Sequence, residues 1–157
     1  KGDELYRRSL YTYVCRSFPH PAMVAFDAPS REECVAERPR SNIPQQALVL
    51  LNDPVFVEAA RVLAERLLIE AKGNDSTRLN RAFQLALTRE PSPRERQILT
   101  KLLNAQRERY KANPEDAKKL IATGSKPAPD NQEPHELAAW TTISRALLNI
   151  YETTARF

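Results

Sequence analysis

Prolines that stand at the start of apolar helical patterns constrain this chain more than any other feature of its sequence. Five of the twelve prolines, Pro44, Pro54, Pro93, Pro114 and Pro134, each precede a stretch whose apolar residues recur at the spacing of an α-helix. Proline suits the first turn of a helix, because the N–H that it lacks would have no partner there and its fixed φ already matches the helix. Only three residues are glycine. We therefore expect a mainly α protein whose helices have fixed starting points.

Capping residues and apolar stripes support the same division into helices. Asp53 is a natural N-cap for a helix from Pro54 to about Ala71, and Ser92 with Glu95 forms the pattern of a capping box. The inner faces are marked by apolar residues at helical spacing: Phe56, Ala60, Leu63 and Leu67; Leu79, Phe83, Ala86 and Leu87; Ile98, Leu99, Leu102, Leu103 and Tyr110; and Leu137, Trp140, Ile143, Leu147, Leu148 and Tyr151. Short connections favour antiparallel neighbours. The sequence predicts a bundle of about five to seven helices with Trp140 in its core.

The chain has the length of one domain, in which we distinguish four parts. Residues 1–43 form an extended or irregular N-terminal segment, 44–124 the helical core, 125–133 a linker and 134–157 the C-terminal helix. The sequence begins Lys-Gly-Asp, from which we expect a piece of a longer protein. Ala47–Leu51 are apolar on every side, which is typical of a buried helix.

The N-terminal segment has no clear helical period. Residues 5–16 alternate in a strand-like way, although a short helix also fits them. Ser30 and Glu33 have the spacing of a capping box, which predicts a short helix from Arg31 to about Ala36. The segment contains both cysteines, Cys15 and Cys34, which either form a disulfide or stay as two free thiols.

Charge and hydropathy exclude some partners. The net charge of +4 arises between residues 61 and 119, which hold 14 Lys and Arg against 8 Asp and Glu. Phe83 and Tyr110, the aromatic residues in that stretch, fall in apolar helix positions, whereas nucleic-acid binding favours aromatics interleaved with a basic stripe. No apolar run approaches the roughly 20 residues that span a bilayer. We expect neither nucleic-acid binding nor a membrane span.

Motifs that carry out chemistry are missing from this sequence. It has no glycine-rich phosphate loop, no G-x-S-x-G, no H-E-x-x-H and no EF-hand spacing. The two histidines, His20 and His135, and the two cysteines 19 residues apart do not form a metal-ligand pattern. We predict no catalytic residue, no metal site and no cofactor in this chain. Enzymatic activity stays open but is not favoured.

One polar stretch, from Phe26 to Asp53, is the candidate site. Two interpretations compete. In the first, the stretch is a structural clamp: an arginine, Arg38 or Arg40, holds the Asp27 carboxylate, and the amide side chains bond to backbone at a helix start. In the second, the same arginines bind an anionic or sugar ligand. The candidate residues are Asp27, Arg31, Arg38, Arg40, Asn42, Gln45, Gln46, Asn52 and Asp53.

Several short blocks resemble a known family. They are Arg7–Tyr11 (RRSLY), Phe26–Pro29 (FDAP), Arg31–Cys34 (REEC), Asn42–Leu48 (NIPQQAL), Leu51–Pro54 (LNDP), Leu85–Glu95 and Ala138–Glu152. Together they resemble the C-terminal domain of unknown function of large planctomycete proteins, which often also carry a cytochrome-c-like domain. The resemblance covers nearly the whole chain. It departs from the family at Asn149–Thr153, where Asn-Ser-Asn-Glu-Phe is more usual.

The resemblance implies an extracytoplasmic protein of which this chain is the C-terminal portion. Sibling domains of the same protein are then the expected partners, with a surface polysaccharide as a further one, and any haem belongs to a separate domain. Export also favours a Cys15–Cys34 disulfide. The leading hypothesis is a non-catalytic structural or interaction module. The alternative is part of an enzyme or polysaccharide-binding site in which Asp27, Arg38 and Arg40 contact the ligand.

Overall fold

A computed structural model describes residues 6–7, 9–15, 17–30, 32–37, 39–71, 73–129 and 131–154. The described elements are the 3-10 turn η2 (Ser9–Tyr11) and the helices α1 (Pro21–Ala25), α2 (Pro44–Asn52), α3 (Pro54–Glu70), α4 (Asp75–Leu87), α5 (Pro93–Ala112), α6 (Pro114–Ile121), α7 (Pro134–Leu148) and α8 (Tyr151–Thr154). Within these ranges no residue lies in a strand. The prediction of a mainly α helical bundle is confirmed.

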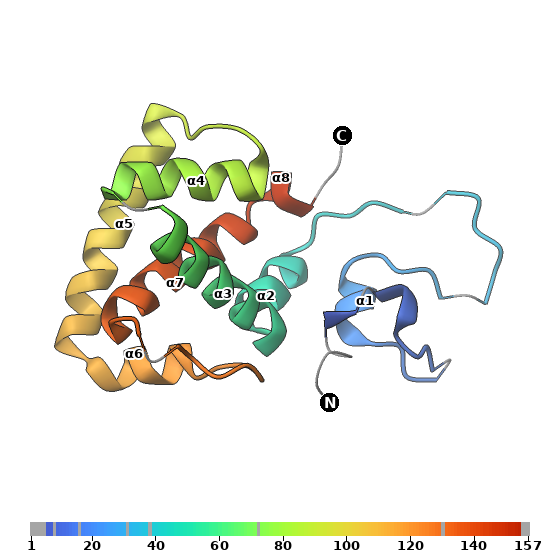
Figure 1. The fold of residues 1–157 in the computed structure, drawn as a ribbon. Helices are drawn as coiled ribbons and strands as arrows, with labels where there is room; N and C mark the ends of the chain where they lie inside the picture. Colours follow the sequence, from blue (N-terminus) through green and yellow to red (C-terminus); the bar gives the residue numbers. More distant parts are fainter. Residues whose placement is uncertain are drawn as a thin grey trace.

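Helix α7 is the central element of the bundle. It packs against α3, α5 and α6, and it also touches α2, α4 and α8 (Figure 1). Leu137, Trp140, Ile143 and Leu147 are fully buried on it, as the predicted stripe requires. Burying one large apolar side chain contributes about 1.5–3 kcal/mol. The helix carries its charged residues near its two ends, so its middle is free to be covered on several sides.

Local signals fix where the helices begin. The Asp53 carboxylate accepts a hydrogen bond from the Val55 N–H at 2.9 Å, as an N-cap for α3. At the start of α5, the Ser92 Oγ accepts from the Glu95 N–H at 3.3 Å, and the Glu95 carboxylate accepts from the Ser92 N–H at 2.7 Å. The five predicted proline starts all open helices, α2, α3, α5, α6 and α7. These starts need no tertiary contact to be recognised in the sequence.

Two predictions for the N-terminal segment are wrong over the residues described. Over its described residues the strand-like stretch forms η2 and irregular backbone, so the strand interpretation is wrong, and the short-helix alternative is met only by the 3-10 turn at Ser9–Tyr11. The short helix predicted near residues 31–36 is also missing, because 32–37 contain no helical residue. Ser30 Oγ accepts a hydrogen bond from the Glu32 N–H at 3.3 Å, in place of a capping box with Glu33. Residues 32–37 are all exposed, and a helix that short does not form without a face to bury.

Two predictions for the helices are also corrected. Helix α2 is not buried: Leu50 is its only buried residue, and Leu48 is 56% exposed. The reason is its place at the edge of the bundle, between α1 on one side and α3 and α7 on the other. The C-terminal helix ends at Leu148 and restarts as α8, so Tyr151 is exposed and does not continue the buried stripe.

The N-terminal segment lies beside the bundle and meets it through α2 and α3. Figure 1 shows α1 next to α2, and the described residues between α1 and α2 swing away from the bundle before they return to Pro44. The N-terminal segment therefore forms a second region whose packing differs from that of the bundle.

In the part of the chain that the structure describes, no helix is both long enough and apolar enough to cross a membrane.

Candidate functional site

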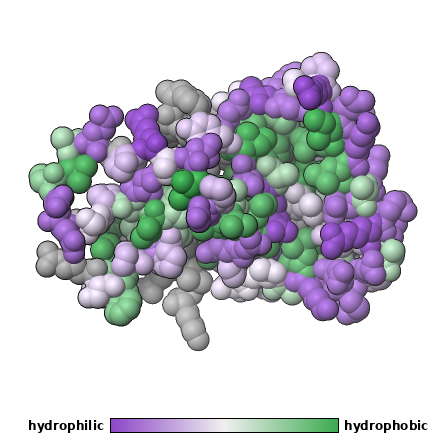
Figure 2. Space-filling model, turned by 180° about the vertical axis from the view of Figure 1, so that it is seen from behind, coloured by the Kyte–Doolittle hydropathy of each residue, from purple (hydrophilic) through white to green (hydrophobic). Residues whose placement is uncertain are grey.

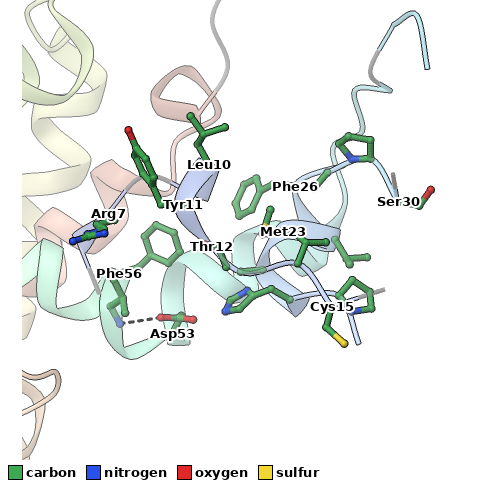
Figure 3. A pocket seen from close by; sticks show the side chains of 18 of the residues that line it. Arg7, Leu10, Tyr11, Thr12, Cys15, Met23, Phe26, Ser30, Asp53 and Phe56 are labelled. Carbon is green, nitrogen blue, oxygen red and sulfur yellow. Dashed lines mark hydrogen bonds between the residues drawn. The ribbon is translucent and has the colours of Figure 1, made fainter. Parts of the chain in front are cut away.

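A wide cleft lies between the N-terminal segment, which includes α1, and the first turns of α3. Its volume is about 1400 Å³, and we call it the N-terminal cleft. Figure 3 shows Tyr11, Phe26, Met23 and Phe56 around it, with Arg7 and Asp53 at its polar side. Most of its lining is apolar: Leu10, Val14, Ala22, Met23, Val24, Phe26, Ala28, Val55, Phe56 and Ala59. The cleft is therefore suited to apolar contact with a few polar groups at its edges.

Large apolar side chains of this region reach solvent. Leu10 and Tyr11 are 69% and 68% exposed. Three further apolar or aromatic residues that line the cleft are also exposed: Tyr6, Val24 and Val55. Figure 2 shows apolar residues at the surface on the rear side of the molecule. A single exposed apolar residue is ordinary, but several around one cleft form an exposed apolar patch.

Polar groups of several kinds lie in the lining of the cleft. Arg7, Thr12, His20, Glu32 and Asp53 line it together with Cys15. The Asp53 carboxylate is already engaged as the N-cap of α3. Among the described residues, no group of three His, Cys, Asp or Glu side chains could hold a metal ion. The cleft thus combines a largely apolar lining with charged side chains of both signs.

Asp27 and Gln46 are brought together by a residue that the sequence did not point to. The Asp27 carboxylate accepts hydrogen bonds from the Ser41 backbone N–H at 2.7 Å and from Ser41 Oγ at 2.8 and 2.9 Å. Gln46 Nε2 donates to the Ser41 carbonyl at 3.0 Å and to Ser41 Oγ at 3.3 Å. We call Asp27, Ser41 and Gln46 the Ser41 anchor. It bonds irregular backbone to the start of α2, which is the kind of internal bonding that the clamp interpretation expects.

Asp27 also has an unusual backbone conformation. Its φ is +57°, in the left-handed region, where Asp is one of the few non-glycine residues found with some frequency. This turn directs the chain out of α1 into the connection that returns at Ser41. The Ser41 anchor then fixes both ends of that connection.

The remaining predicted site residues are dispersed. Arg40, Asn42 and Gln45 are exposed, and Arg40 makes no ion pair in the described structure. Asn52 Nδ2 donates to the Leu48 carbonyl at 3.0 Å, so it bonds within its own helix. Arg31 and Arg38 lie outside the described residues. The structure thus joins Asp27 with Gln46, and it places Asp53 at the cleft.

Both cysteines are free thiols in this structure. Cys15 is half-buried at the N-terminal cleft and Cys34 is exposed. A Cys15–Cys34 disulfide in an oxidising compartment stays a prediction, which the mass of the unreduced protein tests.

Sequence reasoning missed a buried polar cluster on α3. Glu58 and Arg61 are buried, as is most of Glu65. Arg61 donates to the carbonyl of Lys126 at 2.7 Å and to that of Pro127 at 3.4 Å, and it pairs with Glu65. Glu58, Arg61 and Glu65 are three and four residues apart, which places them on one side of the helix. This spacing is the feature of the sequence that could have predicted the cluster. They hold the connection between α6 and α7 against α3.

Glu58 is held in its charged form. Burial raises the pKa of its carboxyl, but hydrogen bonds from the Tyr6 hydroxyl and from the Ser125 and Lys126 N–H groups, with the charge of Arg61, outweigh burial and lower the pKa overall. The carboxylate is therefore a fixed negative charge inside the protein at neutral pH.

A second ion cluster ties three helices together. The Arg107 guanidinium of α5 donates to both carboxylate oxygens of Asp75 at 2.5 and 2.8 Å and to those of Glu136 at 2.5 and 2.8 Å. Asp75 and Glu136 lie in the first turns of α4 and α7, where the helix dipole favours a negative charge. Trp140 Nε1 also donates to Glu136 at 3.0 Å. This cluster is structural and lies away from the cleft.

Comparison with known proteins identifies the family but no activity. The model of the family PSD1, described as a protein of unknown function (DUF1553), matches residues 1–103. Comparisons with curated proteins and with solved structures gave no significant match. The matched region is 103 of the 157 residues and contains the N-terminal cleft, the Ser41 anchor and α1–α4. The chain belongs to the PSD1 family of proteins of unknown function (DUF1553).

Proposed function

We propose that this chain is a non-catalytic structural and interaction module whose N-terminal cleft docks sibling domains of the same protein. The observation that carries the proposal is the set of exposed apolar side chains around the cleft, among them Leu10, Tyr11 and Val55. The bundle buries its own apolar residues and does not need these side chains. An interface with a folded neighbour would remove them from water.

The wider setting of the proposal comes from the family resemblance. We propose that residues 1–157 are a single unit at the C-terminal end of the family domain, in a planctomycete protein outside the cytoplasm. Some members of such proteins carry a cytochrome-c-like domain, which would hold any haem. The N-terminal cleft of this chain would then contact its neighbours in that longer protein.

A sugar-binding role is the alternative, and one observation favours it. Tyr6 and Tyr11 both line the cleft and both are exposed, and a tyrosine ring offers an apolar face with a polar hydroxyl. Asp27, Arg38 and Arg40 would contact an anionic or sugar ligand in this alternative, as part of an enzyme or a polysaccharide-binding site. The bonding of Asp27 to Ser41 favours the structural role.

A binding experiment with surface variants separates the two functions. The sibling domains are titrated with the wild-type chain and with a Leu10→Ser, Val55→Ser double variant by calorimetry. Ile69→Ser is the matched control, because Ile69 is an exposed apolar residue of α3 that does not line the cleft. We expect the double variant to weaken binding at least about tenfold, the loss expected when apolar contact area is removed, and the control to bind normally.

A different result would support the alternative. The same proteins are applied to a panel of neutral and anionic polysaccharides. If sibling domains do not bind and a polysaccharide does, with binding lost in Tyr11→Ser, the docking function is wrong and the sugar-binding function replaces it.

A further inference from the structure

Glu58 uses its two carboxylate oxygens for two different regions of the molecule. Oε1 accepts a hydrogen bond from the Tyr6 hydroxyl at 2.6 Å. Oε2 accepts from the backbone N–H of Ser125 at 2.5 Å and from that of Lys126 at 3.3 Å. The partners are 52 and 67 or 68 residues away in the sequence. One buried side chain therefore joins the N-terminal segment to the α6–α7 connection.

The α6–α7 connection is held closely at this point. Gly124 has a φ of +108°, and a Cβ there would come within 2.7 Å of the Glu58 Cβ, so the backbone lies directly on Glu58. Arg61, one turn further along α3, binds the carbonyls of Lys126 and Pro127. The N–H groups of the connection thus bind Glu58 and its carbonyl groups bind Arg61. Loss of either charge would take away the hydrogen-bond partners of these backbone groups.

Glu58 does not itself line the N-terminal cleft, but its hydrogen-bond partner Tyr6 does. Tyr6 is one of the residues that line the cleft, and so are Val55, Phe56 and Ala59 of α3, which flank Glu58 in the sequence. A Tyr6 ring that moves to admit an occupant takes its hydroxyl away from the Glu58 carboxylate. The carboxylate then keeps its bonds to Ser125 and Lys126 but loses one of the bonds that fix its orientation.

We propose that Glu58 couples the N-terminal cleft to the α6–α7 connection, so that displacement of Tyr6 in the cleft loosens the backbone at Gly124–Lys126. The coupling does not depend on the identity of the occupant. It is reciprocal: a change at Gly124 that moves the carboxylate also moves Tyr6. The α6–α7 connection then has a fixed and a loosened form. An occupant of the cleft shifts the equilibrium between these two forms by the difference between its affinities for them.

The first test measures amide hydrogen exchange of Ser125 and Lys126 by NMR in the intact chain. Tyr6→Phe keeps the ring but removes the hydroxyl. We expect both amides to exchange about tenfold faster, as for the loss of one hydrogen bond to a charged group. Tyr11→Phe is the matched control, because Tyr11 also lines the cleft as an exposed tyrosine but does not bond to Glu58 among the described contacts. It should leave both rates unchanged.

Glu58→Gln shows whether the two amides report on the carboxylate at all. They should exchange faster in this variant than in Tyr6→Phe. The proposal is overturned if Glu58→Gln accelerates the exchange and Tyr6→Phe does not, because the loop would then depend on Glu58 but not on the cleft. Equal acceleration in Tyr6→Phe and Tyr11→Phe would also overturn it.

The second test runs in the opposite direction. Gly124→Ala forces the Glu58 side chain to move, and Gly73→Ala is its control, since Gly73 also has a positive φ but its added Cβ would meet only Thr77, at 3.5 Å or more. We expect the NMR signals of the Tyr6 ring to shift in Gly124→Ala and to stay in place in Gly73→Ala. Unchanged Tyr6 signals in a folded Gly124→Ala protein would contradict reciprocal coupling. If Gly124→Ala does not fold, the first test decides.

Discussion

Phe83 and Phe18 are the same residue type in opposite surroundings. Phe83 of α4 is fully buried in the bundle, whereas Phe18 of the N-terminal segment is 82% exposed. The contrast extends to the two regions as wholes. Among the residues that the structure describes, the bundle buries sixteen in one cluster, and the described part of the N-terminal segment contributes none of them. The bundle is therefore stabilised by its own core, whereas described apolar side chains of the N-terminal segment, such as Phe18, stay exposed.

Polar contacts differ between the regions in the same way. Arg107, Arg61 and Arg89 each join elements of the bundle that are far apart in the sequence. The N-terminal segment is held through the Ser41 anchor and the Tyr6–Glu58 hydrogen bond. Because apolar burial dominates folding free energy, we expect the two regions to respond very differently to equivalent substitutions.

The largest expected contrast comes from phenylalanine truncation. Phe83→Ala removes a fully buried ring and should lower the free energy of unfolding by about 3–5 kcal/mol. Phe18→Ala should change it by less than about 0.5 kcal/mol. Urea unfolding followed by Trp140 fluorescence measures both. Similar losses in the two variants would show that the N-terminal segment is part of the same core.

The next contrast tests the ion cluster of the bundle. Arg107→Ala leaves Asp75 and Glu136 close together without their shared cation and should cost about 2–3 kcal/mol. Lys118→Ala is the control, because its pair with Glu115 lies in solvent on both sides and should contribute at most about 0.5 kcal/mol. Thermal unfolding monitored by circular dichroism gives both values. If the Arg107 variant were as stable as the Lys118 variant, the ion cluster would not stabilise the bundle.

Glycine substitutions sharpen the comparison at Glu58, the residue of the bundle that also bonds to Tyr6 of the N-terminal segment. Gly124→Ala combines a positive φ with a clash against Glu58 and should destabilise the protein by about 2–3 kcal/mol. Gly73→Ala has the backbone strain without the clash, and about 1 kcal/mol is expected. Chemical denaturation of the two variants measures the difference. If the two losses were equal, the packing of Gly124 on Glu58 would be of no consequence for stability.

Acid should weaken the bundle in particular. The hydrogen bonds from Arg89 lower the pKa of Glu95 from 4.5 to about 2, and those from Arg107 also lower the pKa of Asp75. A lowered pKa in the folded state contributes stability that is present above the unfolded pKa and is lost as the pH falls toward the folded one. We expect stability to be level from pH 7 to about 5 and to fall between about 4.5 and 2.

The variant Glu95→Gln checks that interpretation. It should have a shallower decline of unfolding free energy between pH 4.5 and 2 than the wild type, since one titrating group has been removed. Glu108→Gln is the control, because Glu108 is exposed and pairs only with Lys111 at 3.8 Å. The same slope in all three proteins would mean that the lowered pKa of Glu95 is not linked to folding.

The smallest expected effect is at the Ser41 anchor. Ser41→Ala removes the two hydroxyl contacts with Asp27 but keeps the backbone one. We expect faster amide exchange near residues 41–43, with the melting temperature of the bundle unchanged within about 1 °C. A clear fall in melting temperature would mean that the anchor supports the bundle as well as the N-terminal segment.

The helices could be predicted because their signals are local. Pro54 after Asp53 and Glu95 after Ser92 define helix starts within four residues. The partners of Asp27 could not be predicted in this way, because the bond to Ser41 joins irregular segments without any period. The serine partner was overlooked since serine carries no charge, whereas the predicted pair of Asp27 with Arg38 lies outside the described residues and stays a prediction.

The second limit on prediction from the sequence was the position of each helix in the fold. The apolar run Ala47–Leu51 predicted a buried helix. Whether an apolar helix is buried depends on the elements that pack against it, and α2 lies at the edge of the bundle. Glu58 and Arg61 have the pattern of ordinary charges on an amphipathic helix, yet they bind a connection 65 to 68 residues later. The sequence alone gives neither the depth of a helix in the fold nor the loop that returns to it.

Native-state hydrogen exchange of the intact chain, measured at increasing urea concentrations, tests the separation of the two regions most directly. We predict that the amides of α3, α5 and α7 exchange only through global unfolding, with one common free energy. The amides of α1 should exchange through local opening, at a clearly lower free energy. If α1 shared the free energy and urea dependence of α7, the N-terminal segment would be an integral part of the folded core, and the account of an available cleft beside a self-sufficient bundle would be wrong.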